Sequence, residues 1–223
     1  MKNYLDTVYN IKKKALTYEY PNNLTQYLID RFDIHEGSKL LEPGFGRGEF
    51  LYQFEKKKIK CFGFDNSDYN YELKLNSEIK KHDAITIPWP YPDNYFDVIY
   101  NKSFIEHFYY PEILFSEFYR ILKPGGKIIC LTPDWETIYK TFYEDFTHRT
   151  PFTKKSLEDI NEISGFNNIK VEKFLQLPVL WNNNQILYLL SYLTRIFTPE
   201  LLIKKSKWVR FSKEIMLLSY AEK

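Results

Sequence analysis

Residues 38–50, Ser-Lys-Leu-Leu-Glu-Pro-Gly-Phe-Gly-Arg-Gly-Glu-Phe, decide the fold, because a short apolar strand runs there into a glycine-rich turn and then into a helix. Gly44, Gly46 and Gly48 alternate with larger residues, so the backbone can turn sharply and leave room for a ligand lying across it. Glu49 stands where a dinucleotide site has its last glycine, and a carboxylate in the first helical turn would repel a pyrophosphate. The stretch therefore predicts a cofactor loop for a less anionic ligand.

This loop resembles motif I of the class I S-adenosylmethionine-dependent methyltransferases, in which it holds the methionine end of the cofactor. The resemblance extends by motif order over residues 36–175. It implies that S-adenosylmethionine is the cofactor and that the loop residues bind it, namely Glu42, Gly44, Gly46 and Gly48.

Acidic residues end the next two expected strands. Residues 60–65 are predicted to form a buried strand ending at Asp65, at the ~20-residue separation from the loop at which a carboxylate meets ribose hydroxyls. A third short strand is expected over 79–84, and the resembled family uses its terminal pair, Asp83 and Ala84, against the adenine. The neighbouring strand-end residues Asn66 and Asn101 complete the expected cofactor site.

Strands and helices alternate in βα order from Ser38 to Leu131, which predicts a parallel sheet with a ligand at the carboxyl ends of its strands. Further strands are expected over 95–101, 169–175 and 215–220, and residues 121–129 are expected to supply a helix end, a turn and a fifth strand. The predicted fold class is α/β: a Rossmann-like, doubly wound, seven-stranded sheet, mostly parallel with an antiparallel seventh strand, and helices on both faces.

The length of 223 residues suits one methyltransferase domain. Its expected parts are an N-terminal cap of two helices over 1–35, a cofactor-binding core over 36–133, and acceptor-side insertions at 134–153 and 176–208. In the second insertion, five apolar residues fall on one helical face, which predicts a lid or a homodimer surface. They are Ile186, Leu187, Leu190, Leu193 and Ile196.

The amino-acid composition limits the kinds of partner and the cellular location that we expect for this protein. The 31 Lys and Arg nearly balance the 29 Asp and Glu, so the net charge of +2 argues against nucleic acid as a partner. Cys61 and Cys130 are expected to be buried thiols of a reducing compartment, and with no apolar leader at Met1 we expect a cytoplasmic protein. Polar residues interrupt the apolar stretch 186–203, so no transmembrane segment is expected, although Trp181 and Trp208 leave a weak membrane-surface contact open.

The acceptor site is predicted in the segment 143–153, Tyr-Glu-Asp-Phe-Thr-His-Arg-Thr-Pro-Phe-Thr, which resembles a segment of methyltransferases acting on sugars and surface glycans. His148 is the candidate general base, with Asp145 to orient it. In the alternative reading, Asp145 and Thr153 only turn and cap the chain before the next helix. His107, after the fourth strand, is the next catalytic candidate, and no metal site is expected from one His and one Asp.

These features predict a methyltransferase that uses S-adenosylmethionine on a small-molecule or carbohydrate acceptor, with a sugar hydroxyl in surface-glycan (polysaccharide) biosynthesis as the leading candidate. Two alternatives stay open. One is methylation of a quinone or another aromatic small molecule, which the aromatic-rich 176–208 insertion could cover. The other is a cofactor-binding subunit without catalysis.

Overall fold

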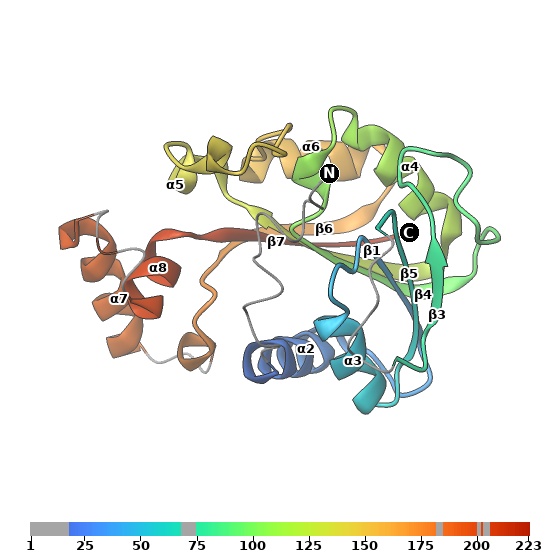
Figure 1. The fold of residues 1–223 in the computed structure, drawn as a ribbon, viewed down its shortest axis with the longest axis horizontal. Coiled ribbons are helices and arrows are strands. Elements are labelled where there is room, and N and C mark those ends of the chain that lie inside the picture. The colour runs from blue at the N-terminus through green and yellow to red at the C-terminus, as the bar shows by residue number, and fades with distance from the viewer. Residues whose placement is uncertain (1–17, 68–74, 182–184, 200–201, 203–205) are drawn as a thin grey trace. The chain divides into compact units, whose positions relative to one another are not determined.

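The computed structural model describes residues 18–67, 75–181, 185–199, 202 and 206–223 (Figure 1). The chain divides into two compact units. The first unit comprises residues 1–101 and 120–126, and the second comprises residues 102–119 and 127–223. The first of the two helices expected over 1–35 lies outside the described residues.

Seven strands form one sheet in the order β3-β2-β1-β4-β5-β7-β6. The strands are β1 Lys39–Pro43, β2 Lys60–Asp65, β3 Glu78–Lys81, β4 Phe96–Lys102, β5 Leu122–Pro133, β6 Asn167–Phe174 and β7 Met216–Glu222. The pairs among β3, β2, β1 and β4 are parallel, whereas β7 runs antiparallel to both β5 and β6. The predicted seven-stranded Rossmann-like fold is therefore confirmed, including the antiparallel seventh strand beside the fifth.

Helices and short 3-10 turns connect these strands. The helices are α2 Glu19–Phe32, α3 Glu49–Lys56, α4 Pro111–Ile121, α5 Trp135–Ile138, α6 Lys154–Ile163, α7 Gln185–Phe197 and α8 Lys207–Lys213. The 3-10 turns are η2 Ile105–His107, η3 Phe142–Glu144 and η4 Pro178–Leu180.

In the first unit, α2 and α3 lie side by side next to the β1–β3 strands (Figure 1). Helix α2 begins at Glu19, two residues before Pro21, which was the predicted start signal. A proline is tolerated in the first turn of a helix because the N–H groups there have no intrahelical partner. Strand β2 contributes Gly63, where an added Cβ would stand 2.8 Å from Leu51 and 2.9 Å from Phe45. A glycine at this strand position therefore lets α3 and the glycine-rich loop pack directly onto the sheet.

In the second unit, α6 packs on β6 and β7, and α7 packs on α8 (Figure 1). Thr153 caps α6 by accepting a hydrogen bond from the Ser156 N–H, as the alternative reading of this residue expected. The apolar face predicted for α7 is mostly exposed, with Ile186 at 73% and Ile196 at 53%. Its role as a lid or dimer surface stays a prediction.

The strand boundaries differ from the sequence prediction by one or two residues in several places, and two of the differences change how a motif is placed. Strand β5 begins at Leu122 and takes in the segment 123–126, expected as a turn, with Gly125 at φ 75° marking the bend. Strand β3 ends at Lys81, so Asp83 and Ala84 follow the strand rather than end it.

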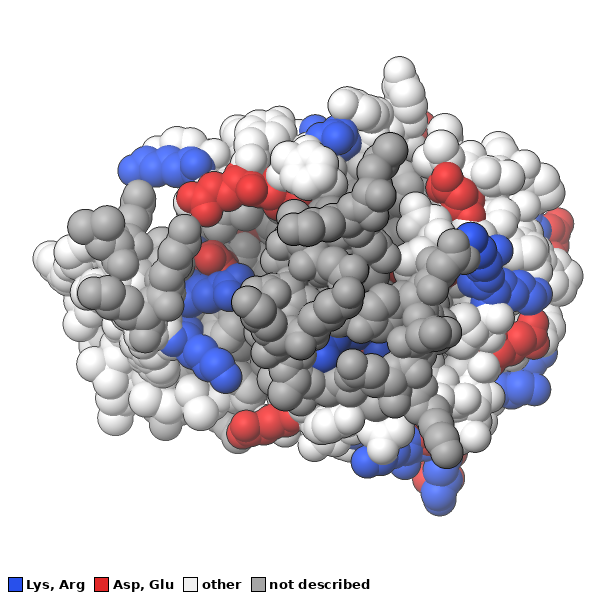
Figure 2. Space-filling model, viewed as in Figure 1, with Lys and Arg blue, Asp and Glu red and all other residues white. Residues whose placement is uncertain are grey.

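No helix among the described residues combines the length and the apolarity needed to cross a bilayer. Over the described residues on the face drawn in Figure 2, acidic and basic side chains are interspersed. This face thus presents mixed charge, in keeping with the net charge of +2.

Candidate active site

The glycine-rich loop lies between β1 and α3 in the first unit. Gly44, Gly46 and Gly48 all have positive φ, between 54° and 75°. No atom of the described residues lies within 4 Å of where a Gly46 side chain would begin, so these residues leave open space on that side of the loop. At the end of β1, the Glu42 side chain is only 4% exposed. The loop therefore has the open backbone and the strand-end carboxylate that the predicted cofactor site requires.

Asp65 closes β2 beside this loop. One carboxylate oxygen accepts a hydrogen bond from the Gly46 N–H at 3.0 Å, and the other accepts one from the Ser67 N–H at 2.9 Å. Each carboxylate oxygen has two lone pairs, so Asp65 can still accept hydrogen bonds from a ribose. The structure thus brings together the two motifs that the sequence separates by about twenty residues.

The other predicted cofactor residues follow the neighbouring strands of the same unit. Ala84 is buried, and its carbonyl accepts a hydrogen bond from the Trp89 indole at 2.9 Å, whereas Asp83 and Asn66 are exposed. Asn101 is fully buried near the end of β4. All of the predicted cofactor residues therefore follow or end four adjacent parallel strands, where α/β sheets bind ligands.

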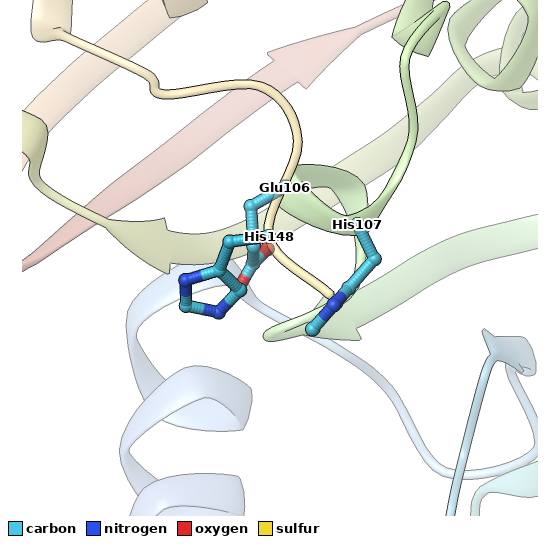
Figure 3. Close-up of side chains that lie close together, drawn as sticks. All are labelled: Glu106, His107 and His148. Atoms are coloured by element: carbon cyan, nitrogen blue, oxygen red, sulfur yellow. The ribbon is translucent and has the colours of Figure 1, made fainter. Parts of the chain in front are cut away.

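The candidate catalytic residues lie in the second unit. Glu106 and His107 come from η2, just after β4, and His148 comes from the loop after η3. Their side chains point toward one another, and one ligand atom of each lies within 4.8 Å of the others (Figure 3). We call these three residues the Glu106–His107–His148 cluster. The two histidines predicted as separate candidates are therefore neighbours, with ring centres 4.9 Å apart.

Asp145 is linked through Thr147 to a different histidine from the one predicted. His148 Nδ1 bonds to the Phe142 carbonyl oxygen at 2.6 Å, so a backbone group orients this ring. Asp145 accepts a hydrogen bond from the Thr147 hydroxyl at 2.6 Å, and that hydroxyl oxygen lies 2.9 Å from His107 Nδ1. The prediction that Asp145 orients His148 is wrong, because the short turn after Asp145 places Thr147 between the carboxylate and His107. Asp145 also accepts the Thr147 N–H at 3.0 Å, so the alternative reading of it as a turn residue holds as well.

Glu106 is the residue that sequence reasoning missed. Its side chain has no exposed surface, and burial raises the pKa of its carboxyl to about 7 against the opposing effect of nearby N–H groups and the Thr132 hydroxyl. Burial, together with the neighbouring His148, lowers the pKa of His107 to about 4, so this imidazole is neutral at pH 7. One feature of the sequence could have pointed to Glu106 as a buried site residue. Its carboxylate is next to a histidine and directly follows the apolar pair Phe104 and Ile105.

Comparison with known proteins identifies the class of protein. Residues 15–171, more than half of the chain, match the family described as Methyltransferase domain, so the chain belongs to this methyltransferase family. Phosphoethanolamine N-methyltransferase 3 of Arabidopsis thaliana is 32% identical over 152 residues, which are 64% of this chain and 29% of that protein. The ubiquinone/menaquinone biosynthesis C-methyltransferase UbiE of Blochmanniella floridana is 29% identical over 136 residues, covering 56% of this chain and 54% of that one.

A solved structure shows the same fold. Phosphoethanolamine N-methyltransferase 2 of Haemonchus contortus, solved with S-adenosyl-L-methionine, superposes with a TM-score of 0.69 at 20% identity, covering 99% of this chain and 59% of that one. The chain spans less than a third of the length of the Arabidopsis relative. The family match thus identifies a methyltransferase domain, and its fold is shared with a relative that was solved with S-adenosyl-L-methionine.

Proposed function

We propose that this protein transfers the methyl group of S-adenosylmethionine to a hydroxyl of a small polar acceptor, and that the acceptor is a sugar used in surface-glycan synthesis. Methyl transfer from a sulfonium releases a neutral thioether, so the enzyme mainly has to align donor and acceptor. A hydroxyl must also lose its proton, and a positioned base contributes ~10²–10⁴-fold. The observation that carries the proposal is the pair of adjacent imidazoles, one of them neutral at pH 7 and linked to Asp145 through Thr147.

The cofactor roles proposed here follow the resemblance residue by residue. Glu42 and the loop glycines would bind the methionine end, while Asp65 and Asn66 would bind the ribose. Asp83 and Ala84 would bind the adenine, and Asn101 would contact the cofactor from the end of β4. Support comes from the exposure of Asp83 and Asn66 and from the open loop at Gly46.

The segments of the second unit would serve the acceptor. We propose that 134–153 and 176–208 are acceptor-side insertions of a single catalytic domain, and that α7 is a lid or a homodimer surface. Its exposed apolar side chains support this, among them Ile186 and Phe197. We also propose that the protein works in the cytoplasm, where the buried thiols Cys61 and Cys130 would stay reduced.

An amine acceptor is the second candidate, because several curated relatives are named phosphoethanolamine N-methyltransferases. An amine needs less help from a base than a hydroxyl does near neutral pH. A quinone is the third candidate, supported by the UbiE similarity. The remaining alternative is a subunit that binds the cofactor without catalysis.

A labelled-methyl assay separates these candidates. The purified protein would be incubated with methyl-labelled S-adenosylmethionine and, separately, nucleotide sugars, phosphoethanolamine or a demethylated quinone. We expect label in a sugar, and label confined to one of the other two acceptors would refute the sugar. Binding of S-adenosylhomocysteine without transfer to any acceptor would favour the non-catalytic subunit.

His148→Ala tests the catalytic part of the proposal. It should lower turnover of the true acceptor by ~10²-fold while leaving cofactor affinity nearly unchanged, because the proposed cofactor contacts come from other segments. His35→Ala is the matched control, since His35 is an exposed histidine paired with Asp33. Equal turnover in folded His148→Ala and wild type would remove His148 from the catalytic site.

A further inference from the structure

We propose that Glu106, His107 and His148 bind a divalent transition-metal ion that in turn coordinates the acceptor hydroxyl. One ligand atom from each residue lies within 4.8 Å of the others, and the three side chains lie close together (Figure 3). Two nitrogen donors and one carboxylate form a ligand set used by catalytic zinc and by other first-row metals. The role in the reaction rests on the proposed function, whereas the binding of the ion does not.

Glu106 gives a second, independent indication of a ligand. The side chain is completely buried, and one of its oxygens, Oε2, accepts a hydrogen bond from the Thr132 hydroxyl at 3.0 Å. The other oxygen, Oε1, is buried and has no hydrogen-bond partner among the residues that the structure describes. A buried carboxylate oxygen without a partner is costly, and a bound cation would remove that cost.

The hydrogen bonds behind the imidazoles direct their lone pairs away from the backbone. His148 Nδ1 faces the Phe142 carbonyl, which can only accept, so Nδ1 carries the proton and Nε2 carries the lone pair. The Thr147 hydroxyl proton is donated to Asp145, so the Thr147 oxygen accepts from His107 Nδ1 and the same tautomer follows. Metal-bound histidines have this arrangement, in which the second nitrogen donates to a carbonyl or to a carboxylate-linked group.

The backbone fixes the distance between the two segments that supply the ligands. The Glu106 carbonyl accepts hydrogen bonds from the Arg149 N–H at 2.8 Å and the Thr150 N–H at 3.1 Å. The residue after His148 is therefore tied directly to η2. Two ligands about 2.1 Å from one ion at the tetrahedral angle lie about 3.4 Å apart, so combined side-chain movements of about 1.4 Å or less would complete the site from separations of at most 4.8 Å.

The donor types select the metal. Imidazole nitrogen favours zinc, copper, iron or nickel over magnesium and manganese, which prefer oxygen ligands. Three protein ligands leave a coordination position open for an acceptor oxygen, and the two half-buried imidazoles leave a route from solvent. A bound ion would lower the pKa of a coordinated acceptor hydroxyl so that its proton is released to solvent, and His107 and His148 would then assist as ligands of the ion in place of acting as the base. The new oxygen–carbon bond forms as the sulfur–carbon bond breaks, and S-adenosylhomocysteine leaves neutral.

Direct metal titration tests the site without any acceptor. Chelator-stripped protein would be titrated with Co²⁺, whose visible absorption reports the coordination, and with Zn²⁺ by calorimetry. We expect one ion per chain, at least ~100-fold weaker binding in His148→Ala and Glu106→Gln, and a change of less than ~2-fold in His35→Ala. Circular dichroism would verify folding, and Glu106→Asp replaces Glu106→Gln if the latter does not fold.

Several outcomes would overturn the proposal. Absence of saturable binding below about 1 mM, or binding that the cluster variants leave unchanged, would eliminate the site. Sugar methylation at the full rate by stripped protein in chelator would eliminate the ion's role while leaving the proposed function intact. One ion bound at the cluster, together with methylation of a different acceptor, would support the site and refute only the sugar.

Discussion

Asp145 and His107 are connected through a single side chain, the Thr147 hydroxyl, which donates to the Asp145 carboxylate at 2.6 Å and lies 2.9 Å from His107 Nδ1. The connection fixes the tautomer of His107 and holds its ring against rotation. The carboxylate also favours positive charge on His107, although burial outweighs it and keeps the imidazole neutral at pH 7. Asp145 is therefore a positioning residue that acts through another side chain.

Thr147→Val should reveal this connection, since valine keeps the volume of threonine and removes the hydroxyl. We expect kcat for the true acceptor to fall ~10-fold and the Kd of S-adenosylhomocysteine to stay within ~2-fold. Asp145→Asn should give a loss of similar size. A merely structural role would lower the Tm without changing the pH profile of kcat, whereas a positioning role shifts that profile. Thr86→Val, at an exposed threonine of the first unit, is the control.

Glu106 should make stability depend on pH. The pKa of its carboxyl is raised by burial from 4.5 to about 7, so the folded protein holds this proton more tightly than the unfolded chain. The stabilisation is complete below pH 4.5 and is lost as the pH rises through 7, a change of ~3 kcal/mol in the free energy of unfolding. Urea unfolding of wild type and Glu106→Gln in chelator, from pH 4.5 to 8, measures the difference. Parallel curves for the two proteins would contradict the assignment.

The arrangement of the glycine-rich loop and Asp65 was predictable because its signals are local in the sequence. A glycine-rich turn between strand and helix, followed by acidic strand ends, requires only backbone periodicity and spacing, and the structure places Gly46 and Asp65 in direct contact. Strand β7 could be placed only through the resemblance, since nothing local in Met216–Glu222 specifies an antiparallel partner.

The Glu106–His107–His148 cluster was harder to predict because its contacts join distant segments. The separation between His107 and His148 in the sequence gives no indication that their rings meet. The orientation of Asp145 depends on a turn whose backbone selects Thr147 as its partner. Glu106 was overlooked because a lone glutamate in a short stretch is usually exposed, and only the folded chain shows that it is fully buried.

Asp65→Ala should weaken cofactor binding. The carboxylate would lose its ribose hydrogen bonds, worth ~1.5–3 kcal/mol, which is roughly tenfold to more than a hundredfold in affinity. Calorimetric titration with S-adenosylhomocysteine measures the change. Asp33→Ala removes an exposed carboxylate elsewhere in the first unit and should leave the affinity unchanged. If folded Asp65→Ala binds as tightly as wild type, Asp65 is not the ribose ligand.

Gly63→Ala should damage both the stability and the cofactor loop. The new methyl group would stand 2.8 Å from a Leu51 methyl and 2.9 Å from the Phe45 ring, closer than carbon atoms can approach. Because Phe45 lies within the loop, relief of the clash would move the backbone that Asp65 holds at Gly46. We expect a loss of ~1–3 kcal/mol in the free energy of unfolding, together with weaker S-adenosylhomocysteine binding. Leu51→Val removes one of the methyl groups that the new alanine would clash with. The double variant should therefore lose less stability than the sum of the two single changes. Strictly additive losses in urea unfolding would argue against this packing.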